Sequence, residues 1–114
     1  YIRGGVIENN TAAGNGGGIC RAGSGWYYSQ GNRSNGYITG GVLRNNTAGN
    51  SGGGVYLADY ACKLTVSGGR ITGNTAANGG GGIYVASNCA GLQLKENGQL
   101  FDNLAKIGQD VYAS

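Results

Sequence analysis

A single motif recurs four times along this chain and restricts the folds open to it. In each copy a Gly-Gly pair, or Asn-Gly, precedes an aliphatic residue that is followed three positions later by Asn-Thr-Ala or Asn-Leu-Ala. The copies begin at Gly4, Gly40, Gly68 and Asn97, which are 36, 28 and 29 residues apart. A glycine run or its equivalent and an apolar pair then follow, as Gly18-Ile19-Cys20, Gly54-Val55-Tyr56, Gly82-Ile83-Tyr84 and Asp110-Val111-Tyr112. Such a period is typical of architectures that stack equivalent segments.

The composition of the copies favours strands over helices. Glycine accounts for 26 of the 114 residues, and each glycine inside a helix costs about 1 kcal/mol relative to alanine. The apolar residues instead alternate with polar ones in short segments bounded by Gly or Asn, as expected of strands between tight turns. These segments are Tyr1-Ile2-Arg3, Val6-Ile7-Glu8, Gly18-Ile19-Cys20-Arg21, Tyr56-Leu57, Leu64-Thr65-Val66, Ile83-Tyr84-Val85 and Leu92-Gln93-Leu94.

Three strands and three turns per copy fit the period, which predicts an all-β fold. We expect a right-handed parallel β-helix, or solenoid, of about four coils of roughly 28 residues each. One domain then spans residues 1–114. The longer first interval predicts an inserted loop at residues 22–36.

Stacking in register makes each repeat position a column along the helix axis, with neighbours about 4.8 Å apart. Three apolar columns are expected to fill the core: Ile7, Leu43, Ile71 and Leu100; Ile19, Val55, Ile83 and Val111; and Ile2, Ile38, Val66 and Leu94. A fourth column is an asparagine ladder of Asn10, Asn46, Asn74 and Asn103. We expect these amides to bond to one another at a corner, where Asn also tolerates left-handed backbone angles.

The pattern Gly-Gly-x-Ile-x-x-Asn-Thr-Ala, followed by Gly-Gly-Gly-Ile-Tyr-Val, resembles the repeats of bacterial right-handed parallel β-helix proteins. These include adhesin-like surface proteins and, more distantly, the autotransported polymorphic membrane proteins, whose repeats carry Gly-Gly-Ala-Ile and Phe-x-x-Asn. The second motif has an approximate counterpart in Leu100-Phe101-Asp102-Asn103. The resemblance covers nearly the whole chain and implies an extracellular or cell-surface location.

Two groups of aromatic residues are candidates for ligand binding or an interface. The inserted loop carries Trp26, Tyr27, Tyr28 and Arg33, a set suited to stacking on sugars or to contacting a protein. The alternative is that these rings fold back over a coil. Tyr56, Tyr84 and Tyr112 are expected to point outwards in one column, with Cys20 at the same place in the first coil. They form either a simple stabilising stack or a binding stripe for a glycan or protein.

The three cysteines permit one disulfide within the chain. Cys62 and Cys89 precede equivalent strands and should lie at one corner of adjacent coils, within disulfide distance. Cys20 is then left unpaired. Three cysteines without histidine or a Cys-x-x-Cys spacing form a poor ligand set, so no metal site is expected.

The sequence gives little support for an enzyme. No histidine is present, which excludes a Ser-His-Asp or Cys-His arrangement. The five acidic residues are scattered, and Asp102 and Asp110 are the only candidate pair for a polysaccharide lyase or hydrolase. We expect no catalytic residue and no cofactor. The net charge of +3 is spread along the chain, and no apolar run approaches 20 residues, so neither nucleic-acid binding nor membrane insertion is expected.

The remaining expectations concern assembly and partners. A β-helix has two open ends with unpaired strand edges, which favour head-to-tail pairing. The leading hypothesis is an extracellular structural or adhesive module that self-associates head-to-tail into a filament or surface layer. The alternative is a glycan- or receptor-binding adhesin fragment of a longer protein, with a glycan or a host surface protein as its partner.

Overall fold

The computed structural model describes residues 1–22, 35–58, 63–86, 91–95 and 97–113, which form four stacked coils. We call them coils 1 to 4 in chain order. Coil 1 contains β1 (Val6–Glu8), β2 (Thr11–Ala12) and β3 (Ile19–Ala22); coil 2 contains β4 (Asn35–Ile38), β5 (Val42–Arg44), β6 (Thr47–Ala48) and β7 (Val55–Ala58). Coil 3 contains β8 (Lys63–Val66), β9 (Arg70–Thr72), β10 (Thr75–Ala76) and β11 (Ile83–Val85); coil 4 contains β12 (Gly91–Leu94), β13 (Gln99–Phe101) and β14 (Val111–Ala113).

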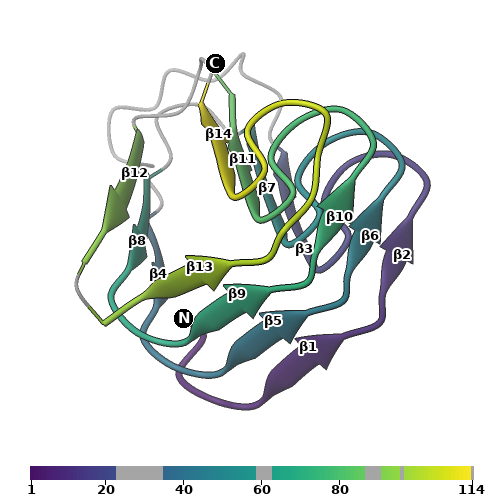
Figure 1. The fold of residues 1–114 in the computed structure, drawn as a ribbon. Helices are drawn as coiled ribbons and strands as arrows, with labels where there is room; N and C mark the ends of the chain where they lie inside the picture. Colours follow the sequence, from purple (N-terminus) through teal and green to yellow (C-terminus); the bar gives the residue numbers. More distant parts are fainter. Residues whose placement is uncertain (23–34, 59–62, 87–90, 96, 114) are drawn as a thin grey trace.

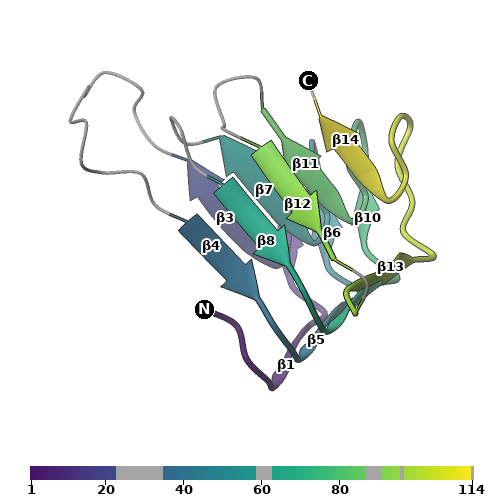
Figure 2. The ribbon, with the colours of Figure 1, turned by 90° about the vertical axis from the view of Figure 1, so that its left-hand side faces the viewer.

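The strands form four parallel sheets that surround one core (Figure 1). Their orders are β1-β5-β9-β13, β2-β6-β10, β3-β7-β11-β14 and β4-β8-β12. Each strand pairs with its counterparts in the adjacent coils, so neighbours in a sheet are one turn of the solenoid apart in the chain. In Figure 1 the chain turns anticlockwise, and Figure 2 shows that later coils lie nearer the viewer of Figure 1, which makes the helix right-handed. The predicted parallel β-helix is confirmed.

The prediction of three strands per coil was wrong, because Thr-Ala forms a strand of its own. Thr11 pairs with Thr47, which pairs with Thr75, and the alanines pair in the same way. A two-residue strand shows no alternation of polarity in the sequence, so the segment looks like part of a turn. Tyr1-Ile2-Arg3 was predicted as a strand, but only an isolated bridge from Ile2 to Ile38 forms there.

The predicted apolar columns are all present and in register. Ile7 faces Leu43, Leu43 faces Ile71, and Ile71 faces Leu100 in the first sheet. The columns through Val55 and Val66 follow the same rule, with Ile2 joined through its bridge. The inner coils are the best buried, while Leu94 at the end of its column is 49% exposed. Coils 2 and 3 therefore supply most of the core.

The asparagine ladder is confirmed, and its hydrogen bonds run in both axial directions. The backbone N and Nδ2 of Asn46 both donate to Oδ1 of Asn74 in the next coil, each at 3.0 Å. Nδ2 of Asn46 also donates to the carbonyl oxygen of Ile7 in the preceding coil, at 3.0 Å. Asn10, Asn74 and Asn103 follow this pattern where a neighbouring coil exists. Asn46 and Asn74 are fully buried, so their amides depend on the neighbouring coils.

The left-handed backbone angle expected at the ladder lies one residue earlier. Asn9, Asn45 and Asp102 have φ of 59°, 56° and 56°, and Gly73 has φ of 66°. Each immediately precedes a ladder asparagine. Asn, Asp and Gly tolerate this region better than other residues. The turn conformation and the buried amide are thus assigned to two adjacent residues.

Replacing Asn74 by alanine should destabilise the fold by about 3 kcal/mol, because it leaves buried donors of Asn46 and the carbonyl of Leu43 without their partner. Urea unfolding followed by far-ultraviolet circular dichroism measures the loss. Asn50→Ala is the matched control, since Asn50 is exposed and its amide bonds only to Asn78 among the described contacts. Its effect should stay within about 0.5 kcal/mol. Equal losses in the two variants would contradict a special role for the buried ladder.

Candidate binding surface

The tyrosine column is the candidate binding surface that the structure brings together. Tyr56, Tyr84 and Tyr112 occupy one register position on β7, β11 and β14. Their ring centroids are 5.2 Å apart in both pairs, with interplanar angles of 14° and 19°. All three residues are half-buried. We call this set the tyrosine stack.

The stacking limits the contacts that the tyrosine rings can make with a ligand. Tyr84 has another tyrosine on each face, so its faces are occupied by its neighbours. Sugar stacking requires an open aromatic face, and the middle of the stack has none. Tyrosine hydroxyls can donate and accept hydrogen bonds. A ligand lying along the stack would therefore contact ring edges and hydrogen-bond to tyrosine hydroxyls, and would not stack on a ring face.

The stack ends in coil 1 at Cys20, which is paired in register with Tyr56. Cys20 is exposed and carries a free thiol. A second aromatic contact lies on another side of coils 1 and 2, where Tyr1 stacks on Tyr37 with centroids 4.9 Å apart. The guanidinium of Arg3 lies 5.0 Å from the Tyr1 ring centroid, within range of a cation–π interaction.

The other predicted binding residues lie outside the part of the chain that the structure describes. These are Trp26, Tyr27, Tyr28 and Arg33, and the disulfide candidates Cys62 and Cys89. The strands at the ends of the predicted inserted loop are described. Ala22 closes β3 and pairs with Ala58, while Asn35 and Gly36 open β4 and pair with Lys63 and Leu64.

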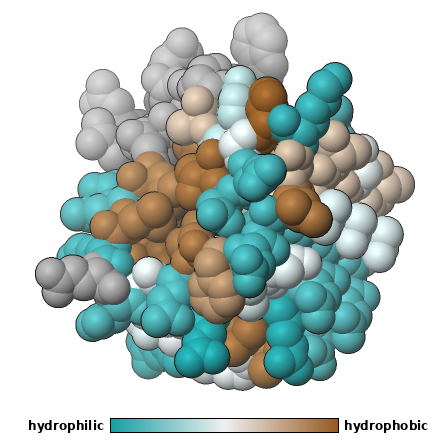
Figure 3. Space-filling model, viewed as in Figure 1, coloured by the Kyte–Doolittle hydropathy of each residue, from teal (hydrophilic) through white to brown (hydrophobic). Residues whose placement is uncertain are grey.

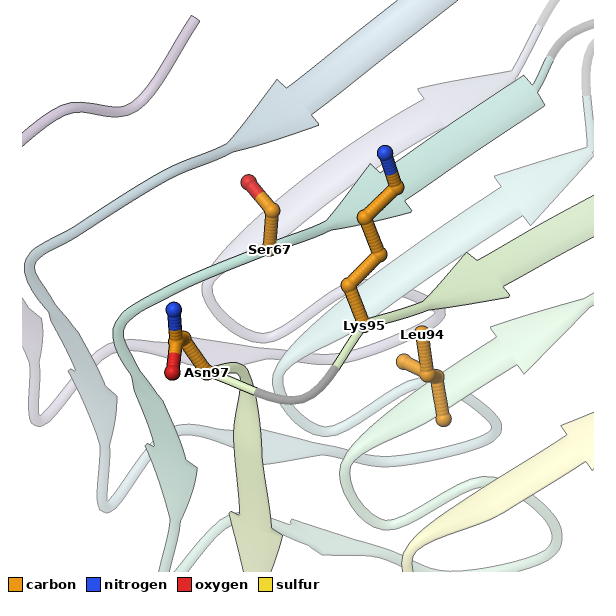
Figure 4. A pocket seen from close by; sticks show the side chains of 4 residues that line it. All are labelled: Ser67, Leu94, Lys95 and Asn97. Carbon is orange, nitrogen blue, oxygen red and sulfur yellow. The ribbon is translucent and has the colours of Figure 1, made fainter.

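A shallow cleft of about 480 Å³ lies at the end of β8 and β12, lined by Ser67, Leu94, Lys95 and Asn97 (Figure 4). Leu94 and Lys95 point to opposite sides of the chain there, as successive residues of an extended segment do. Lys95 is exposed and brings one positive charge. One charged group in an open cleft is a weak basis for a specific ligand site.

One pair of charged side chains links two coils. Nε of Arg44 donates to Oε2 of Glu8 at 2.6 Å, across coils 1 and 2. Both side chains are well exposed, so the pair contributes little to stability. Among the described residues no group of three or more Cys, Asp or Glu side chains is placed to hold a metal ion. The described part of the chain also contains no helix that could span a membrane.

Asp110 has a structural position that the sequence interpretation missed. Its Oδ1 accepts hydrogen bonds from the backbone N of Asn103 at 3.3 Å and from Nδ2 of Asn103 at 3.0 Å. The proposed carboxylate pair with Asp102 had treated this residue as a remote catalytic candidate. The sequence does contain a sign of this structural role. Asp110 stands at the repeat position that is glycine in the other coils, at Gly18, Gly54 and Gly82.

Two segments of the chain, residues 4–20 and 70–86, match the family model of the Chlamydia polymorphic membrane protein repeat. They are equivalent in the fold, since the first contains β1, β2 and the start of β3, and the second contains β9, β10 and β11. Comparison with curated proteins and with solved structures finds no match. The match agrees with the resemblance to polymorphic membrane proteins and is consistent with the cell surface, where proteins with such repeats reside. The wider resemblance to adhesin-like proteins stays a prediction.

Extending the tyrosine stack by one ring should stabilise the protein. Cys20→Tyr places a ring beside Tyr56, and an aromatic pair is worth about 1 kcal/mol beyond its buried area. Urea unfolding of this variant should therefore show a higher midpoint with an unchanged slope. Cys20→Ser is the control for loss of the thiol and should leave the midpoint unchanged. A Cys20→Tyr midpoint at or below that of the serine variant would contradict the prediction.

Proposed function

We propose that the chain is an extracellular structural and adhesive module of a bacterial surface protein. The observation that supports this most directly is that the two segments similar to the polymorphic membrane protein repeat are equivalent parts of one continuous solenoid. Buried asparagines bond each coil to the next, which makes the stack suited to holding a binding surface in a fixed geometry. The structural part of the role rests on this ladder.

The adhesive part of the proposal rests on the tyrosine stack. A half-buried row of stacked aromatic rings offers ring edges at a regular spacing, and Tyr84 and Tyr112 add hydroxyl groups that can hydrogen-bond, at low entropy cost because stacking already restricts the rings. The fitting partner is a chain-like ligand with its own repeated acceptors and donors, either a glycan or an extended peptide of a host surface protein. The inserted loop with Trp26 is the second predicted contact.

We further propose that the module is not an enzyme and needs no cofactor. The sequence has no histidine. Of the candidate pair in coil 4, Asp110 is hydrogen-bonded to Asn103, and Asp102 lies in the turn before the ladder. The pair of Asp102 and Asp110 therefore gives the lyase or hydrolase alternative little support, because one of its carboxylates already accepts hydrogen bonds from Asn103. Head-to-tail self-association of the unaltered chain, expected from the open ends of a β-helix, is not part of this proposal, because the corner of coil 4 argues against it, as set out below.

Binding measurements with paired variants test the adhesive role. The labelled chain is applied to a glycan array and to immobilised extracellular matrix proteins. Tyr84→Phe removes one hydroxyl and keeps the ring, so the apparent affinity for a captured ligand should fall roughly tenfold. Thr47→Val removes an exposed hydroxyl from another sheet and should leave the affinity unchanged.

Trp26→Ala is measured beside them to separate the loop from the stack. A loss only with Trp26→Ala would assign adhesion to the loop and remove the stack from the proposal. Absence of any ligand on both surfaces would count against the adhesive role as a whole. Unchanged unfolding midpoints of the variants ensure that a loss of affinity reflects the missing group.

A further inference from the structure

The corner before β3, β7, β11 and β14 differs between coil 4 and the other coils. The other coils carry three consecutive glycines there: Gly16-Gly17-Gly18, Gly52-Gly53-Gly54 and Gly80-Gly81-Gly82. Coil 4 carries Gly108-Gln109-Asp110. The first position has positive φ in every coil, from 60° at Gly108 to 73° at Gly16, so its glycine serves the backbone conformation. Coil 4 keeps this glycine and loses the other two.

The second and third glycines are needed because the following coil lies directly against them. A Cβ atom at Gly53 would lie 2.4 Å from the carbonyl oxygen of Gly81, and one at Gly54 would lie 2.6 Å from that of Gly82. The corresponding distances to the next coil are 2.5 and 2.8 Å from coil 1, and 2.5 and 2.4 Å from coil 3. Real Cβ atoms essentially never approach other atoms this closely. A side chain at either position would therefore obstruct the stacking of a following coil.

Gln109 and Asp110 place two Cβ atoms where a fifth coil would need its backbone. The carboxylate of Asp110 also accepts the two hydrogen bonds from Asn103 that an asparagine of a following coil would otherwise accept. In coil 3 the same pair of bonds runs from Asn74 to Oδ1 of Asn103. Asp110 thus ends the ladder with a side chain of its own coil.

The opposite end lacks such an obstruction. A Cβ atom at Gly4 would meet nothing within 4 Å, whereas one at Gly40 would lie 2.3 Å from the carbonyl oxygen of Arg3 in the preceding coil. Coils 2 and 3 carry glycine at this position against the coil before them, and coil 1 keeps it, whereas coil 4, whose corner is one residue longer, carries Asn97 there and still stacks on coil 3. Asn10 is exposed, and its Oδ1 occupies the position at which the other ladder asparagines accept bonds from a preceding coil.

We propose that Gln109 and Asp110 act as a stop that keeps a second copy of the chain from stacking its first coil on coil 4. The end that they guard is otherwise prone to association, because unpaired edges of β12, β13 and β14 surround exposed apolar residues. Figure 3 views this end and shows hydrophobic residues gathered near its centre. Its exposed large apolar residues are Leu94, Phe101, Leu104 and Ile107. The stop gives the solenoid one closed end and one open end.

Restoring the glycine corner tests the stop. The double variant Gln109→Gly/Asp110→Gly should assemble head-to-tail, so that its weight-average mass in sedimentation rises at least about twofold over a roughly hundredfold range of concentration. The wild type should remain a monomer over that range. The matched control is Gln109→Ala/Asp110→Ala, which loses the same polar groups but keeps both Cβ atoms and should stay monomeric. Asp102→Asn controls for the lost charge, because Asn occupies this turn position in coils 1 and 2.

A third change identifies the contact that forms. Gly4→Val alone should leave the circular dichroism of the wild type unchanged, because its side chain starts in open space. Added to the glycine pair, it should return the mass to that of a monomer, since the new Cβ would block an incoming coil. Electron microscopy of the glycine pair should show elongated particles that disappear with Gly4→Val.

Three outcomes would overturn the proposal: a wild type that assembles head-to-tail, a folded glycine pair that stays monomeric, or an alanine pair that assembles equally well. If the glycine pair loses its β-sheet signal in buffer, the series is measured in concentrated sucrose, which strengthens apolar burial. A folded monomer under that condition overturns the stop in the same way. Ligand binding by the tyrosine stack is independent of all three results.

Discussion

A buried amide needs a partner for each of its polar atoms, and for Asn46 and Asn74 those partners lie in the adjacent coils. Asn46 and Asn74 have no exposure, and each bonds both to the coil before it and to the coil after it. A shift of one coil against the next would leave donors and acceptors without partners in a medium where that is costly. The ladder therefore fixes the register, and the register fixes the apolar columns and the tyrosine stack.

The same constraint explains where the repeat can vary in length. The spacing from ladder asparagine to the next core column is constant in coils 1 to 3, while the connection from β3 to β4 is eight residues longer than that from β7 to β8. The ladder asparagines lie between β1 and β2, β5 and β6, and β9 and β10, so a longer connection from β3 to β4 leaves their register unchanged. The aromatic loop predicted from the sequence lies in this permissive connection, where binding residues can be added at low cost to stability.

The sequence was sufficient for the columns because their information is periodic. Ile7, Leu43, Ile71 and Leu100 recur at the repeat interval, and parallel stacking turns that interval into contact. Details within one repeat were harder to infer. Asn9 and Asn10 are the same residue type, yet one adopts the left-handed angle and the other is the ladder amide. Gly73 in the third copy was the available clue, because glycine at the first position suits a positive φ and cannot supply an amide. The loop residues Trp26 to Arg33 have no counterpart in the other copies, so periodicity says nothing about them.

Glycine is needed in this repeat for two different reasons: a positive φ at its own position, or close contact with the following coil. Only coil 4, which departs from the repeat, shows which reason applies at which position. Gly108 is kept in coil 4 because the chain itself turns through a positive φ there. Gln109 and Asp110 replace glycines whose need comes from a neighbouring coil, so their side chains mark a position without that neighbour. The carboxylate of Asp110 then accepts the hydrogen bonds of Asn103, the last ladder asparagine of the sequence. Asp110, which looks like half of a catalytic pair in the sequence, is thereby explained by its contact with the last ladder asparagine. The imperfect fourth copy of the repeat thus indicates which end of the solenoid is open to further stacking and which is closed.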